Sequence, residues 1–188
     1  MELAGATAVV TGGGSGIGRA SALAFAAAGA SVLVADIAEA DGNETAQLIE
    51  KDGGKAAYTR VDVTEPDDLA RMLDETEKTF GGVDVLHNNA GIVCGEPHWP
   101  DTDSAVLMRQ VIINLGSVVV GTKLAVPYLT QRGGGAVVNT ASMATSPSTA
   151  SPSRSRVRCA SPQRAIASCS RANTSSTSAA STSRRPES

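Results

Sequence analysis

One glycine-rich segment has the composition and spacing of a phosphate-binding turn. Residues 11–18 read TGGGSGIG and separate an apolar, β-branched run at 6–11 from an alanine-rich stretch typical of a helix. In such a turn Gly12 permits the tight bend, Gly16 lets the main chain approach a pyrophosphate, and Gly18 lets helix and strand pack closely. The free N–H groups at the start of the helix then face the phosphates. The predicted cofactor contacts of this turn are Gly12, Gly14, Ser15, Gly16, Ile17 and Gly18.

An aspartate at the end of the next apolar run supports a dinucleotide as the ligand. Asp36 closes the run SVLVAD, where a carboxylate accepts hydrogen bonds from both ribose hydroxyls. The same negative charge repels a 2′-phosphate, so the sequence favours NAD over NADP. Ile37, the next residue, is included in the predicted cofactor site. The alternative interpretation of Asp36 is a turn residue that caps the following helix.

A sheet and its helices must position these residues. Short β-branched runs alternate with longer helical stretches, which is the pattern of right-handed βαβ units and a parallel sheet covered on both faces. The predicted fold class is α/β, a Rossmann-type doubly wound parallel sheet, truncated after the fifth strand and followed by a disordered tail. The expected strands are 6–11, 31–36, 56–63, 83–91 and 135–142, and the expected helices are 18–29, 39–51, one opened by Pro66, and 104–130.

Composition limits the classes of partner. Residues 1–144 hold 9 basic and 18 acidic residues, a balance that argues against nucleic acid or an anionic membrane. The apolar run of the last expected helix contains Asn114, Lys123 and Pro127, which suits a buried helix better than a membrane span. The N-terminus lacks a signal-peptide pattern, and the 3 cysteines match no metal or redox spacing. We therefore expect a cytoplasmic protein without a metal site.

The last part of the chain has a different composition. Of the 44 residues from Thr145 onward, 37 are Ser, Thr, Ala, Arg or Pro. These residues offer too little apolar surface to offset the entropy lost on ordering. We therefore divide the chain into a domain at 1–144 and a disordered Ser/Arg/Ala-rich tail at 145–188. The tail has three interpretations: a natural extension, a basic interaction segment, or an out-of-frame translation.

Residues 1–144 resemble the classical short-chain dehydrogenases/reductases. The resemblance rests on six features in the family's order, namely TGGGSGIG, Asp36, Asp62–Val63, NNAG at Asn88–Gly91, Asn114 and NTAS ending at Ser142. It implies that Asp62 and Val63 flank the adenine of the cofactor. It also implies that Asn89, Ala90 and Gly91 lie along the adenosine ribose. The family's assembly is a homodimer or homotetramer in which the long helix takes part, an assembly that is in doubt for this chain.

The resemblance also implies a reaction. The family transfers a hydride between nicotinamide and an alcohol or carbonyl carbon, with a tyrosine as acid/base whose pKa is lowered by a nearby lysine. A serine binds the substrate oxygen, and an asparagine anchors a water of the proton relay. Asn114 and Ser142 match these two positions and are the predicted catalytic residues. The implied substrate is a small-molecule secondary alcohol or ketone.

The family's tyrosine and lysine are missing. No Tyr-x-x-x-Lys occurs in the chain, and Ser155 and Cys159 stand near the places where the family has them. We favour an out-of-frame tail, because a GC-rich gene read in another frame yields Ser, Arg, Pro, Thr and Ala in bulk. The expected function is an NAD-dependent oxidoreductase by descent that is inactive in this chain. The alternatives are a non-catalytic NAD-binding module or pseudoenzyme with a basic interaction tail, and a damaged product without function.

Two histidines and one tryptophan stay outside these motifs. His87 precedes NNAG at the end of an expected strand, where we interpret it as a packing residue rather than a base. His98 and Trp99 lie in a loop that the family places beside the substrate cleft. They either touch substrate or belong to a plain exposed loop.

Overall fold

A computed structural model describes residues 2–93 and 101–142 of the chain. The predicted tail at 145–188 lies outside these residues, and so do Cys94, His98 and Trp99.

The described residues form one parallel sheet with the strand order β3-β2-β1-β4-β5. The strands are β1 Thr7–Thr11, β2 Ser31–Asp36, β3 Lys55–Arg60, β4 Val85–Asn88 and β5 Ala136–Asn139. The chain runs outward from β1 to β2 and β3, then returns to the other side of β1. This reversal makes the junction of β1 and β4 the switch point of a doubly wound sheet. The predicted Rossmann-type fold class is confirmed.

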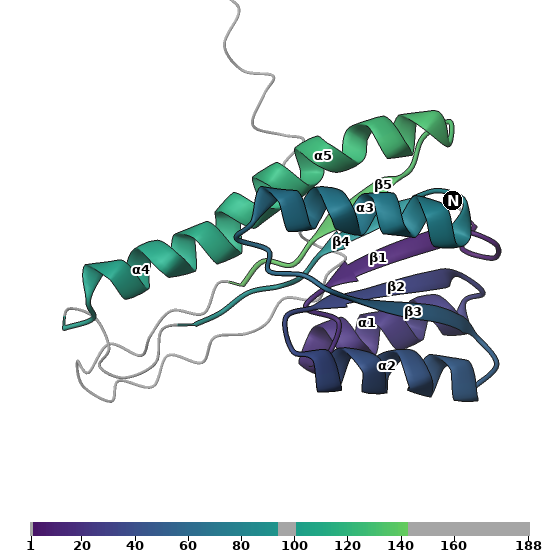
Figure 1. Ribbon diagram of the computed structural model, residues 1–188, viewed down its shortest axis with the longest axis horizontal. Helices are drawn as coiled ribbons and strands as arrows, with labels where there is room; N and C mark the ends of the chain where they lie inside the picture. Colours follow the sequence, from purple (N-terminus) through teal and green to yellow (C-terminus); the bar gives the residue numbers. More distant parts are fainter. Residues whose placement is uncertain (1, 94–100, 143–188) are drawn as a thin grey trace, which may run out of the picture. The chain divides into compact units, whose positions relative to one another are not determined.

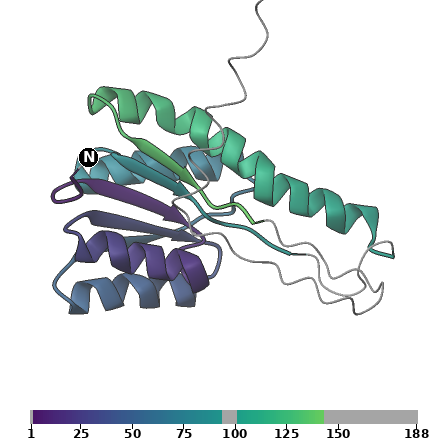
Figure 2. The same ribbon diagram turned by 180° about the vertical axis from the view of Figure 1, so that it is seen from behind.

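Helices cover both faces of the sheet. Their bounds are α1 Gly16–Ala27, α2 Glu39–Lys51, α3 Pro66–Phe80, α4 Ser104–Val111, the π-helix η1 Ile112–Gly116, and α5 Ser117–Gln131. α1 and α2 lie on one face, and α3 and α5 lie on the other (Figure 1, Figure 2). Successive side chains of β1 point to opposite faces of the sheet and so contribute to the core on each face. Val9 packs with Leu69 and Leu73 of α3. Its neighbour Val10 packs with Ala22 and Ile49 on the opposite face.

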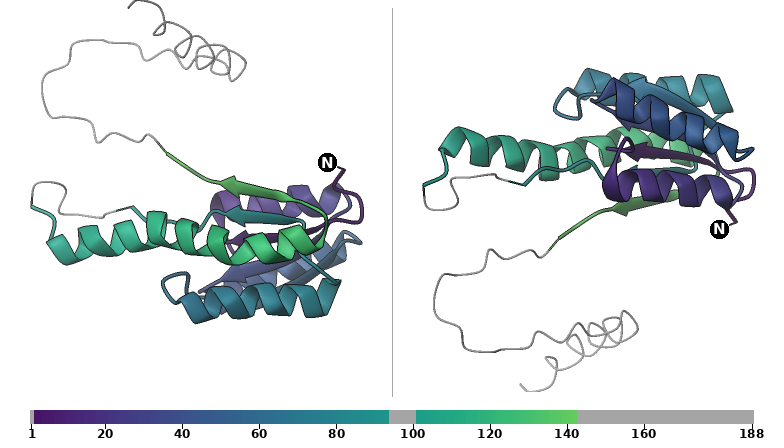
Figure 3. Two further views of the ribbon diagram at one scale, coloured as in Figure 1. Left: turned by 90° about the horizontal axis from the view of Figure 1, so that it is seen from above. Right: turned by 90° about the horizontal axis from the view of Figure 1, so that it is seen from below.

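The long helix predicted at 104–130 is present as α4, η1 and α5. It runs lengthwise along one face of the sheet and projects past the strands at its α4 end (Figure 3). The expectation of a buried helix is right for one side of α5 and wrong for α4, where no residue is buried. The small or branched residues that face the core are Ser117, Gly121, Ala125 and Leu129. The large apolar residues left exposed on the helix are Val106, Met108, Val111, Ile112, Leu115, Val119 and Val126.

Length and composition alone would let one helix of the described ranges, Ser104–Gln131, cross a membrane. A single helix of this kind is weak support for a membrane span, because core helices of water-soluble proteins meet the same criterion.

Three strands end earlier than predicted, each for a local reason. β3 stops at Arg60 rather than at 63, because the Asp62 side chain binds the amide and hydroxyl of Thr64 and turns the chain. β4 stops at Asn88 rather than at 91, because the next two amides bond the Thr11 hydroxyl instead of a neighbouring strand. β5 ends at Asn139 rather than at 142, since β4 itself ends at Asn88, the residue that pairs with Asn139. The predicted site residues after these strands therefore lie in loops.

Candidate dinucleotide-binding site

The glycine-rich turn connects β1 to α1 at the carboxyl edge of the sheet. Gly12 and Gly16 have φ values of 64° and 52°, in the left-handed region that glycine adopts without strain. A Cβ on Gly18 would lie 2.0 Å from the Gly12 carbonyl oxygen, whereas a Cβ on Gly16 would meet nothing within 4 Å. Gly18 thus permits close packing, and the main chain at Gly16 faces open space. Ser15 and Ile17 of the turn are exposed.

Asp36 ties the glycine-rich turn to the end of β2. Its Oδ2 accepts a hydrogen bond from the Gly14 amide at 2.8 Å, and its Oδ1 accepts one from the Ala38 amide at 2.9 Å. Each carboxylate oxygen keeps a further lone pair, so the half-buried group can also accept bonds from ribose hydroxyls. The bond to Ala38, the N-cap residue of α2, also gives Asp36 the turn role that the alternative interpretation assigned to it. Ile37 is exposed beside Asp36.

Arg19 is a site residue that the sequence interpretation missed. Its Nε donates to the Gly14 carbonyl oxygen at 2.8 Å and to the Thr45 hydroxyl at 3.0 Å. Its Nη2 pairs with Glu44 Oε2 at 2.6 Å. Both main-chain polar groups of Gly14 are therefore held, the amide by Asp36 and the carbonyl by Arg19. An arginine directly after the last glycine of the motif was the only signal in the sequence, and its partners on α2 could not be inferred from it.

Asp62 and Val63 follow β3 at the same edge of the sheet. Asp62 Oδ1 accepts hydrogen bonds from the Thr64 amide at 3.0 Å and from the Thr64 hydroxyl at 2.7 Å. These bonds lower the pKa of Asp62. The Asp62 amide in turn donates to Asp68 at 2.9 Å, and this bond lowers the pKa of the Asp68 carboxyl. Asp62 is therefore a fixed, ionised acceptor, and Val63 beside it is partly buried against the core.

The NNAG segment joins the glycine-rich turn to the end of β4. The Thr11 hydroxyl accepts hydrogen bonds from the amides of Asn89 at 3.0 Å and Ala90 at 3.1 Å. The Asn89 side-chain amide donates to the carbonyl oxygens of Thr11 at 3.1 Å and Gly12 at 3.4 Å. A Cβ on Gly12 would lie 2.9 Å from Ala90 Cα. The loops after β1 and β4 are therefore in direct contact at the switch point.

Asn114 lies in the π-turn of the long helix and holds the chain after NNAG. Its Oδ1 accepts from the Ile92 amide and its Nδ2 donates to the Ile92 carbonyl oxygen, both at 2.8 Å. A Cβ on the exposed Gly91 would lie 3.3 Å from the same Oδ1. π-turns are often found at functional sites. The sequence indicated Asn114 as a site residue but not the change of helical pitch that presents it.

Ser142 follows β5 at the same edge as the other predicted site residues. β5 is held in register with β4, and the Asn88 side-chain amide donates to Asn139 Oδ1 at 2.9 Å. Ser142 is exposed. The loops that carry the predicted cofactor and catalytic residues thus all follow the carboxyl ends of strands, or contact a loop that does.

Neither of the chain's 2 tyrosines has the properties of the family's acid/base. Tyr58 donates to the Asp36 carbonyl oxygen at 3.1 Å, and burial raises its pKa. Tyr128 donates to Asp74 on α3, and this bond raises the pKa of Tyr128 to about 12. A general acid/base at neutral pH needs a pKa shifted the other way.

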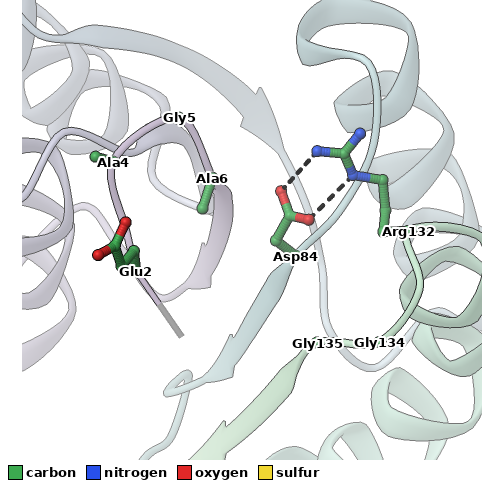
Figure 4. A pocket seen from close by; sticks show the side chains of 8 residues that line it. All are labelled: Glu2, Ala4, Gly5, Ala6, Asp84, Arg132, Gly134 and Gly135. Atoms are coloured by element: carbon green, nitrogen blue, oxygen red, sulfur yellow. Dashed lines mark hydrogen bonds and ion pairs between the residues drawn. The ribbon is translucent and has the colours of Figure 1, made fainter.

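A hollow of about 400 Å³ lies at the opposite edge of the sheet. Its lining residues are Glu2, Ala4, Gly5, Ala6, Asp84, Arg132, Gly134 and Gly135 (Figure 4). Asp84 binds Arg132 Nε at 3.0 Å and the Thr7 amide at 2.8 Å. Because these contacts join the starts of β1 and β4, we assign the hollow a structural role. Across 2–93 and 101–142, no cluster of three or more His, Cys, Asp or Glu residues is placed to hold a metal ion.

The strand order and the contact of two loops at its switch point define a Rossmann-type α/β domain. A family model described as short chain dehydrogenase matches residues 6–153, and the chain belongs to this family. The match runs past the predicted domain boundary at 144.

Curated relatives share sequence with the same part of the chain. The 3beta-hydroxysteroid dehydrogenase 2 of Eggerthella lenta is 43% identical over 142 residues, which are 75% of this chain and 55% of that protein. The 7alpha-hydroxysteroid dehydrogenase of Escherichia coli is 37% identical over 144 residues, 77% of this chain and 56% of its own. The chain therefore spans about half the length of the curated relatives it matches.

Solved structures show the same fold. A 7 alpha-hydroxysteroid dehydrogenase complexed with NADH and 7-oxo glycochenodeoxycholic acid superposes with a TM-score of 0.71 at 37% identity, covering 76% of this chain and 55% of the other. A short-chain type dehydrogenase/reductase from Mycobacterium marinum also gives a TM-score of 0.71 at 37% identity, over 76% and 57% of the two chains.

Proposed function

We propose that this chain is the NAD(H)-binding part of a cytoplasmic short-chain oxidoreductase for secondary alcohols or ketones. The observation that carries the proposal is the Asp36 carboxylate, which the Gly14 amide holds at 2.8 Å inside the glycine-rich turn. A fixed negative charge there accepts ribose hydroxyls and repels a 2′-phosphate. NAD, when bound, supplies the carbon that gives or takes the hydride. The names of the relatives make hydroxysteroids the first substrate class to screen.

Each group of site residues is proposed to bind one part of the cofactor. The pyrophosphate would be bound by the main chain of the turn at Gly12, Gly14 and Gly16, together with Ser15 and Ile17. Gly18 keeps the start of α1 close to the pyrophosphate. Asp36 and Ile37 take the adenosine ribose, and Asp62 and Val63 take the adenine. Asn89, Ala90 and Gly91 complete the ribose side.

We infer that this chain cannot complete hydride transfer, because it lacks the family's proton donor. Ser142 would orient the substrate oxygen and Asn114 would anchor a water of the proton relay. The chain contains no Tyr-x-x-x-Lys, and its two tyrosines have raised pKa values. The second candidate function, a non-catalytic NAD-binding module, is favoured by this same observation. The gene sequence from codon 135 to the stop separates the two, because a frame correction that reveals Tyr-x-x-x-Lys marks a damaged enzyme.

The binding claim is tested by fluorescence titration with NADH and NADPH. The chain should bind NADH more tightly than NADPH. Asp36→Ala should weaken NADH binding about tenfold, since a hydrogen bond to a charged group is worth about 1.5 kcal/mol, and should reduce the preference over NADPH. Asp52→Ala, which removes an exposed acid at the end of α2, is the matched control and should change neither. Equal affinity of the wild-type chain for the two cofactors, or no binding at millimolar NADH, would contradict the proposal.

A further inference from the structure

His87 is a buried polar residue that the proposed cofactor site does not use. It lies on β4 in register with Val10 of β1 and Val138 of β5, and only 6% of it is exposed. The Phe25 ring and its imidazole meet edge to face, with the ring centres 6.1 Å apart. Nε2 lies 3.0 Å from the Thr140 hydroxyl, while Nδ1 is buried and has no hydrogen-bond partner in the described part of the chain.

The direction of the hydrogen bonds around His87 follows from Asn89. The carbonyl oxygens of Thr11 and Gly12 can only accept, so the Asn89 side chain must turn its amide nitrogen toward them. Its Oδ1 then faces the Thr140 hydroxyl at 3.1 Å. An amide oxygen cannot donate, so Thr140 gives its one hydrogen to Asn89.

The Thr140 hydroxyl has then only lone pairs left for His87. Nε2 of His87 must carry the hydrogen, and Nδ1 is the bare nitrogen of the neutral ring. This tautomer agrees with the buried, unpaired Nδ1 next to an aromatic ring, since burial disfavours the charged form and lowers the pKa of His87.

We propose that His87 is a positioning residue for the glycine-rich turn. Its Nε2–H orients the Thr140 hydroxyl, which orients the Asn89 amide, which holds the carbonyl oxygens of Thr11 and Gly12. The same hydrogen bonds fix the end of β5, next to Ser142, against the switch point. Thr140 is thus a second residue of this device. The functional part of the inference rests on the proposed function, because the turn is argued to bind the pyrophosphate.

The experiment is NMR on the ligand-free, ¹⁵N-labelled full chain. Long-range ¹H–¹⁵N spectra report which imidazole nitrogen carries the hydrogen, and His98→Gln assigns the ring signals, because the chain has 2 histidines. Thr140→Val removes the exposed hydroxyl at nearly constant shape, and Thr140→Ser restores it. His87→Leu removes the donor, and His87→Gln supplies an N–H in its place. Thr122→Val is the matched control, because that hydroxyl bonds Asn88 instead.

The expected result has three parts. His87 shows a hydrogen on Nε2 alone. Thr140→Val and His87→Leu shift the Asn89 side-chain amide and the Gly12 and Gly18 amides in the same direction, and the double variant adds nothing further. Thr140→Ser, His87→Gln and Thr122→Val leave these signals near their wild-type positions. A hydrogen on Nδ1, or turn amides that ignore Thr140→Val, overturns the inference.

NADH titration then separates this inference from the proposed function. Thr140→Val should weaken NADH binding about fivefold, the loss expected for one ordinary hydrogen bond, with Thr140→Ser within twofold of wild type. If the wild-type chain does not bind NADH while the NMR shifts appear as described, the proposed function fails and the positioning role of His87 stands. If NADH binds and Thr140→Val binds it as well as the wild type does, the functional part of the inference, that these bonds support cofactor binding, is wrong.

Discussion

Asn114 binds both main-chain polar groups of Ile92, its oxygen to the amide and its nitrogen to the carbonyl, each at 2.8 Å. A helix and the loop after β4 are thereby joined by one side chain. Asn114 lies in the π-helix η1, an element that is frequently found at functional sites.

Replacing Asn114 should free the chain at Ile92. Asn114→Ala loses both bonds, and because one bond to an exposed group is worth about 1 kcal/mol, exchange of the Ile92 amide hydrogen should accelerate at least about fivefold. Hydrogen exchange followed by NMR measures this rate. Asn43→Ala removes a half-buried asparagine that bonds within α2 and should leave Ile92 unchanged. If the exchange rate at Ile92 is unchanged in Asn114→Ala, the two hydrogen bonds from Asn114 do not order the loop.

Gly18 should tolerate no side chain. A Cβ at this position would lie 2.0 Å from the Gly12 carbonyl oxygen and 2.6 Å from Nδ2 of the Asn89 side chain. Gly18→Ala should therefore lower the free energy of unfolding by about 2–3 kcal/mol, as overpacking does. Urea denaturation measures the change. Gly116→Ala is the control, since its nearest contact is 3.9 Å, and it should be neutral or stabilising by up to about 1 kcal/mol. Equal effects of the two variants would refute the steric argument.

Stability should fall as His87 takes up a proton. Burial lowers the pKa of His87 below its ordinary 6.5, so the unfolded chain binds the proton more readily than the folded one. Stability is then complete above pH 6.5 and is lost progressively as the pH falls from there through the lower pKa of the folded state. Urea denaturation from pH 7.5 downward should show this loss in the wild type. In His87→Gln this loss of stability below pH 6.5 should be smaller by the contribution of His87. If the free energies of unfolding of the two proteins fall in parallel with pH, His87 does not cause the loss.

The two tyrosines should ionise late. Burial raises the pKa of Tyr58, and the bond to Asp74 raises the pKa of Tyr128 to about 12. Absorbance titration should find both phenolates forming with midpoints above pH 10, and Tyr128 near 12, while circular dichroism shows the chain folded. Asp74→Asn should bring the Tyr128 pKa back toward 10. A phenolate that forms near neutral pH would reveal an acid/base group after all, and the non-catalytic interpretation would lose its main support.

The order of the elements and the site loops were predictable from the sequence because their signals are local. Gly12, Gly18 and Asp36 sit where strand and helix patterns meet, and the alternation of these patterns predicted the parallel sheet. Strand ends were less predictable. Asp62 ends β3 by a side-chain turn, which competes with a β-branched run that continues to Val63.

The contacts between distant segments could not be predicted. Arg19 reaches from α1 to Glu44 on α2, and Thr140 joins His87 to Asn89 across two strands. Such bonds depend on how far a side chain reaches once the sheet is formed. No spacing in one sequence encodes them. The interpretation of His87 as a packing residue was therefore incomplete, because its imidazole also donates a hydrogen bond.

The strand order has a consequence for synthesis on the ribosome. β1 is made first yet lies in the middle of the sheet, with β2 paired at Ser31 and β4 paired only at Val85. While residues 61–84 emerge, the nascent chain can complete β3, β2 and β1 but leaves the main-chain groups along one edge of β1 unpaired. Unpaired edges of this kind attract other chains and chaperones. A pause in translation before residue 85 would therefore prolong the stage at which this edge of β1 is unpaired.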